Sequence, residues 1–285
     1  MAKYTTNLVL GTGIVNLFSR TPATLAQSAA SLYELTEGKF VLGLGLSGSS
    51  VIQDWHGIPY YQVSPLQRTR EYFKILRLIL SGERVNYESG KIFRLKGFKL
   101  RGFETPLNVP LFLAALGPKN LALGGELADG WFPIWTSFRE LPELMKDLKK
   151  GFEKRPENIS KEVIIAPFII TCASNSTKAK LLVQKNLAYY IGGMGTFHFE
   201  FMKRIGFEVE ANRIRAAWKN GEREIAASNV SDNMIDRIAV LGNREEIRER
   251  YKKLRQLGID LPVTMLPYNC PPGIAIDTIG ALSDS

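Results

Sequence analysis

The sequence predicts an α/β fold, because short apolar runs that end at glycines alternate with amphipathic helical stretches along much of the 285 residues. The pattern is first visible in the runs 7–10 and 40–45, which have no polar face and are typical of strands covered on both sides. Between them, a helical stretch starts near Pro22 and stops at Gly38. Strand, helix and parallel strand form a βαβ unit, and further copies of this unit follow downstream.

The later elements are predicted in the same way. An amphipathic helix covers 65–80, and the alternating stretch 84–102 is expected to form a β-hairpin outside the core sheet. Residues 196–236 break the alternation and are interpreted as a helical insertion after the fifth strand. Because no linker or shift in composition is present, residues 1–285 are expected to form one domain. The remaining strands are placed at 111–115, 130–135, 162–172 and 261–266, and helices at 139–152, 177–190, 245–257 and 274–282.

Six strands separated by helices fit either an open doubly wound sheet or a (β/α) barrel, which closes with eight strands. The segment 43–48 reads GLGLSG and satisfies the GxGxxG pattern of dinucleotide-binding sheets directly after a strand. That fold also needs a helix that begins at the third glycine, and an acid about twenty residues later at the end of a second strand. Here Gly48 leads into a proline-containing loop, and residues 68–71 lie inside a helix. The residues therefore disfavour a dinucleotide-binding sheet.

The chain carries a formal charge of +9 and has an isoelectric point near 9.5, which favours anionic partners such as nucleic acid, a membrane surface or a phosphorylated cofactor. The basic residues are mixed with acids along helical stretches, as on ordinary solvated helix faces, and no nucleic-acid motif accompanies them. We therefore expect no nucleic acid and no membrane as a partner. Cys172 and Cys270 lie far apart without metal-ligand spacing, and the N-terminus shows no export signal, so a cytoplasmic protein without a metal site is expected.

Several stretches match one known family, in order and at plausible spacing along nearly the whole chain. The sequence resembles the luciferase-like flavin and deazaflavin oxidoreductases, and most closely their coenzyme F420-dependent subgroup. The family fold is a TIM-type (β/α) barrel with an insertion after its seventh strand, so the predicted strands correspond to family strands three to eight. The matching stretches are LGTGI (10–14), RTPA (20–23), GKFVLGLGLSG (38–48), DWHG (54–57), RTREY (68–72), GPKNLALGGELADGW (117–131) and YIGGMGTFH (190–198).

Family members begin with two further βα units, so this sequence looks N-terminally shortened, with six barrel strands. An open barrel would expose strand edges at 7–10 and 261–266, which predicts a homo-oligomer, a dimer or larger. The resemblance implies an oxidoreductase that transfers a hydride between coenzyme F420 and a small organic substrate. Two alternatives stay open: an FMN-dependent monooxygenase, and a shortened homologue that binds a cofactor without turnover.

The resemblance also indicates that the cofactor binds at the loops that follow the strands. Residues 11–14 resemble the family segment that bulges against the flavin-like ring, and a cis peptide bond is expected between Gly13 and Ile14. Residues 116–120 open a helix with Pro118 in its first turn and Lys119 beside free backbone N–H groups, which suits a cofactor phosphate. The predicted cofactor-binding residues are Thr12, Gly13, Ile14, Gly45, Leu46, Ser47, Ala115, Leu116, Gly117, Pro118 and Lys119.

The sequence identifies no catalytic acid or base. Some deazaflavin-dependent relatives carry a catalytic glutamate just after the second predicted strand, whereas residues 47–50 of this chain are Ser-Gly-Ser-Ser. His56 and His198 are candidates for a catalytic or substrate-binding role, although a loop histidine is more often an ordinary hydrogen-bonding residue. Because no paired carboxylates and no Ser-His-Asp set appear at the strand ends, the reactive centre is expected to be the cofactor.

Overall fold

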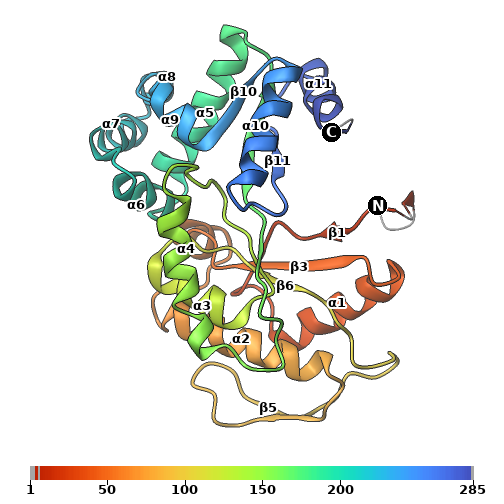
Figure 1. The fold of residues 1–285 in the computed structure, drawn as a ribbon. Helices are drawn as coiled ribbons and strands as arrows, with labels where there is room; N and C mark the ends of the chain where they lie inside the picture. The colour runs from red at the N-terminus through yellow and green to blue at the C-terminus, as the bar shows by residue number, and fades with distance from the viewer. Residues whose placement is uncertain (1–3, 6, 284–285) are drawn as a thin grey trace. The chain divides into compact units, whose positions relative to one another are not determined.

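The computed structural model describes residues 4–5 and 7–283, and these form two compact units. Unit 1 comprises Met1–Phe132 and Asp147–Val163, whereas unit 2 comprises Pro133–Lys146 and Ile164–Ser285. Both units combine parallel strands with helices (Figure 1). Unit 1 is therefore assembled from two separate stretches of the chain.

A parallel sheet with the order β1-β3-β6-β7 forms the centre of unit 1, and β2 also pairs with β3. The middle strand β3 is the continuous apolar run of the sequence, and Leu42 and Leu44 on it are buried. Because the pairings are parallel, the carboxyl ends of β3 and β6 lie at the same edge of the sheet. The strands are β1 (Leu10–Gly11), β2 (Val15–Asn16), β3 (Phe40–Gly45), β6 (Leu111–Leu113) and β7 (Gly130–Trp131).

The main helices of unit 1 begin at signals that are visible in the sequence. Each starts with a proline, whose fixed φ and missing N–H suit the first helical position. The side chains of Thr21 and Ser64 cap the first two helices by accepting the backbone N–H groups of Thr24 and Gln67. The helices are α1 (Pro22–Leu35), α2 (Pro65–Leu80) and α3 (Pro118–Leu127), and shorter turns are a π-helical turn at Val51–Trp55 and a 3-10 turn at Phe152–Lys154.

Within the stretch 84–102, β4 (Val85–Tyr87) and β5 (Leu95–Phe98) form an antiparallel pair. Glu71 of α2 holds the connection between them, because its buried carboxylate accepts the backbone N–H groups of Lys91, Ile92 and Phe93 at 2.9–3.0 Å. The same carboxylate accepts Nε2 of Gln67 at 2.8 Å. Burial alone would raise the pKa of Glu71, but these hydrogen bonds outweigh it and hold the pKa below its ordinary value. The carboxylate is thus a structural anchor.

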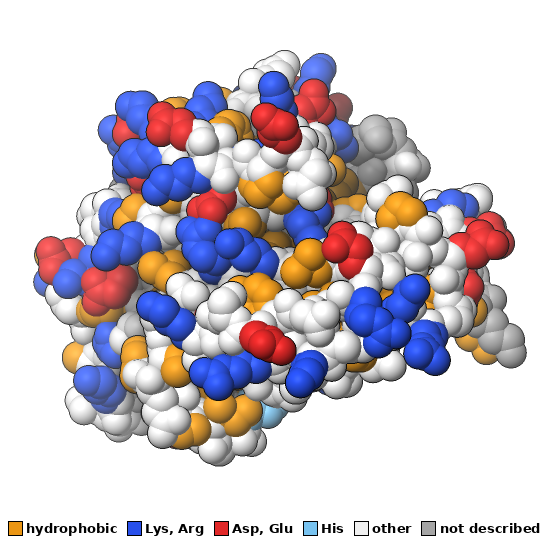
Figure 2. Space-filling model, turned by 90° about the horizontal axis from the view of Figure 1, so that it is seen from below, with side chains coloured by type: hydrophobic (Ala, Val, Ile, Leu, Met, Phe, Trp, Pro, Cys, Tyr) orange, Lys and Arg blue, Asp and Glu red, His pale blue; other side chains and the backbone are white. Residues whose placement is uncertain are grey.

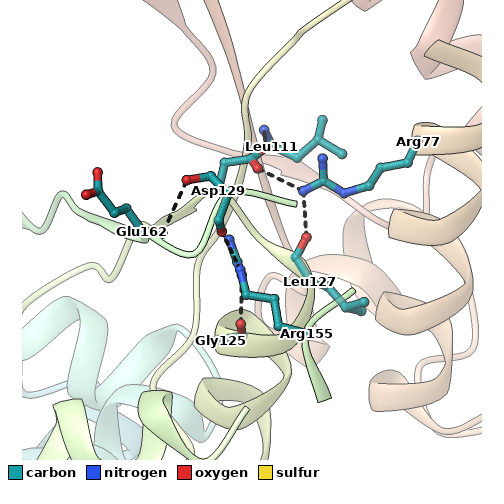
Figure 3. Close-up of polar contacts among 8 residues, drawn as sticks. Arg77, Leu111, Gly125, Leu127, Asp129, Arg155 and Glu162 are labelled. Carbon is teal, nitrogen blue, oxygen red and sulfur yellow. Dashed lines mark hydrogen bonds and ion pairs between the residues drawn. The ribbon is translucent and has the colours of Figure 1, made fainter. Parts of the chain in front are cut away.

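Asp129 joins the amino ends of β6 and β7 (Figure 3). Its carboxylate accepts the backbone N–H of Leu111 at 2.8 Å and the guanidinium of Arg77 at 3.0 Å. Arg155, from the second stretch of unit 1, donates to the carbonyl oxygen of Gly125 at 2.7 Å. These contacts fasten the end of the sheet opposite the carboxyl ends of the strands, where (β/α) folds place stability rather than chemistry.

The sheet of unit 2 has β9 in the middle, with β10 and β11 paired to it in parallel. The hydroxyl of Tyr251 lies 2.7 Å from the hydroxyls of both Thr171 on β9 and Thr264 on β11, and so links the two strands. The strands of this sheet are β9 (Phe168–Ala173), β10 (Ala239–Gly242) and β11 (Val263–Met265), and the helices beside it are α10 (Arg244–Gln256) and α11 (Pro272–Ser283). The two-residue strand β8 (Ile164–Ile165) also falls in unit 2 but does not belong to this sheet.

A run of helices occupies the stretch between β9 and β10, which includes the predicted insertion 196–236. The contact between α5 and α7 is close, because a Cβ placed on Gly192 or Gly193 would lie 2.4 or 2.8 Å from atoms of the Trp218 side chain. Glycine is thus required on this face of α5 by packing. The helices are α5 (Thr177–Gly193), α6 (Phe197–Arg204), α7 (Glu208–Lys219), α8 (Arg223–Ser228) and α9 (Asp232–Ile238), and α4 (Leu141–Lys149) carries the chain from unit 2 back to unit 1.

The α/β class predicted from the sequence is confirmed by the order of strands and helices. The predicted strands did not include β10, which follows directly on α9 and is four residues long. The single domain, the number of barrel strands and the missing βα units stay predictions. Within residues 4–5 and 7–283, no helix combines the length and the apolar character needed to cross a bilayer.

The surface charge is mixed rather than segregated. Figure 2 shows Lys and Arg side chains interspersed with Asp and Glu and with apolar groups on the face that it presents. Several of the basic side chains are paired on the surface, such as Lys146 with Glu143 and Lys185 with Glu224. A mixed surface of this kind agrees with the interpretation of the basic stretches as solvated helix faces.

Candidate cofactor site

Residues 12–14 interrupt the strand formed by β1 and β2 and bulge away between two pairings to β3. Thr12 anchors the bulge, because its Oγ1 donates to the carbonyl oxygen of Gly43 at 2.8 Å and accepts the backbone N–H of Gly43 at 3.0 Å. The peptide bond between Gly13 and Ile14 is cis, as expected from the sequence. Gly13 is exposed, so the bulge presents backbone to its surroundings beside β3.

The glycines of β3 allow neighbouring segments to approach its backbone. A Cβ on Gly43 would lie 2.0 Å from the carbonyl oxygen of Thr12, a distance that no side chain tolerates. A Cβ on Gly45 would lie 3.2 Å from Cβ of Ala114 and 3.2 Å from Cδ1 of Ile14. Packing within the sheet therefore explains the glycines at 43 and 45, and no pyrophosphate loop of the dinucleotide-binding type is needed.

The chain turns after β3 at Ser47, whose φ of 63° lies in the left-handed region that residues other than glycine rarely adopt. Leu46 before it is buried. Tyr60 reaches back to this turn, with its hydroxyl 3.5 Å from the carbonyl oxygen of Ser47 and its ring stacked on Phe18 at 4.8 Å between centroids. The Arg68 guanidinium lies 4.5 Å from the centroid of Phe18. Residues with left-handed backbones gather at functional sites, where packing holds them in place.

The end of β6 leads into the start of α3. The carbonyl oxygen of Ala115 accepts Nε1 of Trp131 at 2.9 Å, which fixes the backbone just before the helix. No side chain caps the first turn of α3, and residues 117–119 are exposed. Asn120 in this turn has a buried Oδ1 without a hydrogen-bond partner. An uncapped helix start beside a lysine is suited to an anion, and the unpartnered Oδ1 is suited to a donor on the same ligand.

All of the predicted cofactor-binding residues lie in unit 1. Residues 12–14 lie between β1 and β2 beside β3, and the other residues stand at or just after the carboxyl ends of the paired strands β3 and β6. They offer exposed backbone, apolar contact from Ile14 and Leu46, and an anion-binding helix start at residues 117–119. None of them carries a carboxylate or an imidazole. The arrangement can thus hold a planar group and a phosphate, and it supplies no side-chain acid. Contact of each residue with a cofactor stays a prediction.

The two candidate histidines have different surroundings. His56 follows the π-helical turn of unit 1 and is exposed, as is the neighbouring Trp55. His198 belongs to α6 of unit 2, where its ring lies 4.8 Å from that of Trp135 and 4.9 Å from that of Tyr190. Burial lowers the pKa of His198 to about 3, so the imidazole is neutral near pH 7. A catalytic role for either histidine stays a prediction.

Neither Asn120 nor Trp135 is among the predicted cofactor-binding residues, although Asn120 lies in the predicted helix start at 116–120. Asn120 stands inside the motif at 117–131 that carries the resemblance, and its place in the first turn of a helix after a strand was the available signal. Trp135 has a φ of 59° and a fully buried side chain, and neither property can be deduced from the residue type. Both residues have buried polar atoms without partners.

The sequence model of the luciferase-like monooxygenase family matches residues 1–261. The chain belongs to this family. The family resemblance inferred from the sequence is therefore confirmed. The loops that follow the strands of unit 1 belong to a luciferase-like protein.

Several relatives among the curated proteins have names that mention a cofactor or a substrate. A putative coenzyme F420-dependent oxidoreductase of Mycobacterium tuberculosis is 31% identical over 271 residues, which cover 89% of this chain and 78% of the relative. A 5,10-methylenetetrahydromethanopterin reductase of Archaeoglobus fulgidus is 28% identical over 285 residues, covering 98% of this chain and 83% of the relative. The luciferase-like chain thus has a putative coenzyme F420-dependent oxidoreductase and a 5,10-methylenetetrahydromethanopterin reductase among its homologues.

One solved structure shares the fold closely. The coenzyme F420-dependent tetrahydromethanopterin reductase from Methanopyrus kandleri superposes with a TM-score of 0.82, covering 99% of this chain and 83% of the other, at 20% sequence identity. At that level of identity the likeness concerns the fold alone. The comparison therefore concerns the luciferase-like fold, whereas the reaction depends on the residues of the site.

Proposed function

We propose that this luciferase-like protein is an oxidoreductase that transfers a hydride between coenzyme F420 and a small organic substrate. The observation that carries the proposal is the strand-end arrangement of unit 1, in which a bulge at residues 12–14, a left-handed turn at Ser47 and an uncapped helix start at residues 117–119 lie on neighbouring strands. The F420-dependent homologue with 31% identity gives further support.

Each part of this arrangement has a role in the proposal. A bound deazaflavin supplies the carbon that gives or accepts the hydride. Residues 12–14 and 45–47 would line the ring, because these two segments offer backbone groups and apolar side chains for contact with a planar group. Residues 115–119 would hold the phosphate through the first-turn N–H groups of α3 and the Lys119 ammonium. The side chains orient the ring, exclude water from it and balance the phosphate charge.

FMN is the alternative cofactor, because it also joins a planar tricyclic ring to a phosphate and gives its family a different reaction, oxygenation. Titration of the purified protein with F420 and, separately, with FMN distinguishes the two through the fluorescence of each ring. We expect saturable binding of F420 and weaker binding of FMN. Tighter binding of FMN would favour the monooxygenase, and a folded protein that binds neither would favour a homologue without turnover.

Replacement of Lys119 by Ala tests the phosphate site. A lost surface cation beside a helix start should raise the dissociation constant of F420 about two- to fivefold at low salt, and the difference should shrink at high salt. Lys74→Ala is the matched control, because Lys74 is also exposed in unit 1 but lies in the interior of α2. Equal affinity of the Lys119→Ala variant and the control at low salt would contradict this placement of the phosphate.

We also propose that the protein is a homo-oligomer. The support lies in unit 1, where Leu8 and Val9 beside the edge strand β1 are 62% and 64% exposed. Exposed apolar residues at an unpaired strand edge are a frequent site of association. Light scattering during size-exclusion chromatography measures the mass, and a monomer of 31.9 kDa at micromolar concentration would contradict the proposal.

A further inference from the structure

The two cysteines of the chain, Cys172 and Cys270, lie side by side in unit 2 although they are distant in the sequence. Cys172 belongs to β9 and is buried, whereas Cys270 follows β11 and is partly exposed. The register of the sheet explains how they meet. Met265 on β11 pairs with Ile170 on β9, so the same parallel register continued by two residues brings residue 267 level with Cys172.

The chain turns back directly after this point. The backbone N–H of Cys270 donates to the carbonyl oxygen of Pro267 at 3.1 Å and closes the turn. The next element, α11, is attached to the end of β9, because the Thr278 hydroxyl accepts the backbone N–H of Ala173 at 2.8 Å. The connection between β11 and α11 is therefore held beside the carboxyl end of β9 by the elements on both sides of it.

The two thiols are linked by hydrogen bonds. The Cys172 S–H donates to the sulfur of Cys270. The Cys270 thiol in turn donates to the carbonyl oxygen of Pro271 at 3.7 Å. A disulfide requires two cysteines whose backbone segments run close together and whose side chains point toward each other. Cys172 and Cys270 fulfil both conditions, and the chain contains no other cysteine that could compete for either sulfur.

Buried thiols are often inert packing groups, and access to solvent distinguishes such a thiol from a reactive one. Cys270 is partly exposed, so a small oxidant can reach one sulfur of the pair. Burial raises the pKa of the Cys172 thiol to about 12 and also raises the pKa of Cys270, although the hydrogen bond from Cys172 opposes the rise at Cys270. Cys270 is therefore the thiol that ionises first and attacks, and Cys172 stands beside it as the second nucleophile.

We propose that Cys172 and Cys270 are a modification site, at which exchange with a low-molecular-weight disulfide forms a reversible disulfide that fastens the connection between β11 and α11 to β9. This site goes beyond the proposed function, because it concerns the covalent state of unit 2 and requires no cofactor. Its two sulfurs come from different elements of the unit, so the bond would join parts of the fold that hydrogen bonds alone hold together in the reduced protein.

The exchange has two steps. The Cys270 thiolate attacks one sulfur of the small disulfide, the S–S bond of that disulfide breaks, and one small thiolate leaves and takes up the proton that Cys270 lost. Cys172 then loses its proton, and its sulfur attacks Sγ of Cys270 in the mixed disulfide, so that the second small thiolate leaves and takes up the proton of Cys172. Two electrons pass from the two cysteines to the small disulfide, which is reduced to two thiols. An excess of small thiol reverses both steps.

The test uses oxidised glutathione as the probe on the full chain at pH 8.5, where more of each thiol is ionised than at neutral pH. Remaining thiols are blocked with N-ethylmaleimide under denaturing conditions before digestion with trypsin. Mass spectrometry should show the peptides of Cys172 and Cys270 joined by a disulfide, without glutathione or maleimide on either, and dithiothreitol should restore both thiols. Two maleimide-labelled cysteines, glutathione retained on Cys270, or chains cross-linked to each other on a non-reducing denaturing gel would each overturn the proposal.

The bond should also stabilise the fold, because it closes a loop of about one hundred residues that contains the helices α5 to α10. We expect the oxidised protein to unfold about 5 °C or more above the reduced protein, measured by circular dichroism during heating. An unfolding temperature that is unchanged or lower after oxidation would overturn the inference that the disulfide fastens the connection after β11 to β9.

Variants test the order of attack. Cys172→Ala leaves Cys270 without a second thiol, so it should accumulate glutathione on Cys270 and show no rise in unfolding temperature. Cys270→Ala leaves only the buried thiol and should take up glutathione at least tenfold more slowly. Cys172→Val covers the case in which the Ala variant does not fold, and the wild-type experiment depends on neither variant. Equal rates of glutathione uptake in Cys172→Ala and Cys270→Ala would overturn the assignment of Cys270 as the first nucleophile.

Discussion

Glu71 in unit 1 and His198 in unit 2 are both ionisable groups with buried polar atoms, but they differ in their hydrogen bonds. Each oxygen of Glu71 accepts two hydrogen bonds, and the group stays charged. His198 has no partner at either ring nitrogen, and burial keeps it neutral. The carboxylate is therefore saturated by the protein itself, whereas the imidazole keeps its full hydrogen-bonding capacity unused.

The difference teaches that polar burial has two purposes in this chain. In unit 1, Glu71 and Asp129 tie together segments that are distant in sequence, such as the connection between β4 and β5 and the start of β6. In unit 2, the unpartnered atoms of Trp135 and His198 stabilise nothing that is visible, so they cost stability in the free protein. The first arrangement serves the scaffold, and the second does not. Substitutions can test this contrast.

The largest effect is expected at Gly43, where the sheet of unit 1 leaves no room for a side chain. The Ala variant places a Cβ 2.0 Å from the carbonyl oxygen of Thr12, so the bulge at residues 12–14 has to shift. We expect the free energy of unfolding to fall by about 3 kcal/mol or more, measured by urea denaturation. Gly273→Ala is the control, because nothing lies within 4 Å of the added Cβ, and its stability should be unchanged or slightly higher. A change below about 1 kcal/mol at Gly43 would show that the contact can relax.

Glu71→Gln should cost about 2–3 kcal/mol, because one of the two acceptor oxygens becomes an NH₂ group that faces backbone donors. Glu88→Gln, at an exposed position of the same region, is the control and should change stability by less than about 0.5 kcal/mol. If both variants unfold at the same urea concentration as the wild type, Glu71 is not an anchor.

Glu71 also predicts a pH dependence. Its folded pKa lies below the ordinary value of 4.5, so its contribution is complete above that pH and is lost as the pH falls through the lower folded value. The wild type should therefore lose more stability than Glu71→Gln on acidification below about pH 4.5. Parallel losses in the two proteins would contradict the assigned pKa direction.

His198→Leu tests the other side of the contrast, and its effect should be smaller. Removing two unsatisfied nitrogens should leave stability within about 1 kcal/mol of the wild type, or raise it. The folded pKa near 3 lies below the ordinary 6.5, so the wild type should lose up to about 1.4 kcal/mol for each pH unit between these values, whereas the Leu variant should lose less. Unfolding curves recorded from pH 7 to pH 4 measure this. A destabilisation as large as that of Glu71→Gln would show that His198 is a scaffold residue.

The smallest effect on stability is expected for exposed ion pairs, which are not buried polar groups of either kind. Lys185 and Glu224 are 2.8 Å apart, but both side chains remain largely in solvent. Lys185→Ala should change the free energy of unfolding by less than about 0.5 kcal/mol, and salt should reduce the effect further. A larger loss would mean that exposed ion pairs, and not only buried polar groups such as Glu71, stabilise the fold.

Local signals in the sequence predicted much of the fold. The prolines at 22, 65 and 118 stand at the starts of α1, α2 and α3, and the continuous apolar run at 40–45 is β3. Propensity and patterning act over a few residues, so they identify such elements well. The division between β1 and β2 could not be predicted in this way, because it depends on hydrogen bonds between Thr12 and Gly43, which are 31 residues apart.

The candidate site was predicted by resemblance more than by local chemistry. The motifs predicted that residues 12–14, 45–47 and 115–119 lie together. In unit 1, residues 12–14 lie beside β3, and residues 45–47 and 115–119 are at the carboxyl ends of the paired strands β3 and β6. Neighbours distant in sequence determine the rest. The saturation of Glu71 depends on the backbone of residues 91–93, and the desolvation of His198 depends on rings from Trp135 and Tyr190, so neither property is visible in residue types or spacing.

The division of unit 1 into two stretches of chain has a consequence for how the protein is made. The stretch Asp147–Val163 packs tightly on α3, since a Cβ on Gly151 would lie 1.9 Å from the carbonyl oxygen of Ala122, and Arg155 donates to Gly125. During translation, residues 133–146 of unit 2 leave the ribosome before this stretch does. Unit 1 can complete its contacts only once residue 163 has emerged, and a fragment that ends at Phe132 leaves that face of α3 uncovered. A fragment expressed to contain the whole of unit 1 therefore has to extend to residue 163 or beyond.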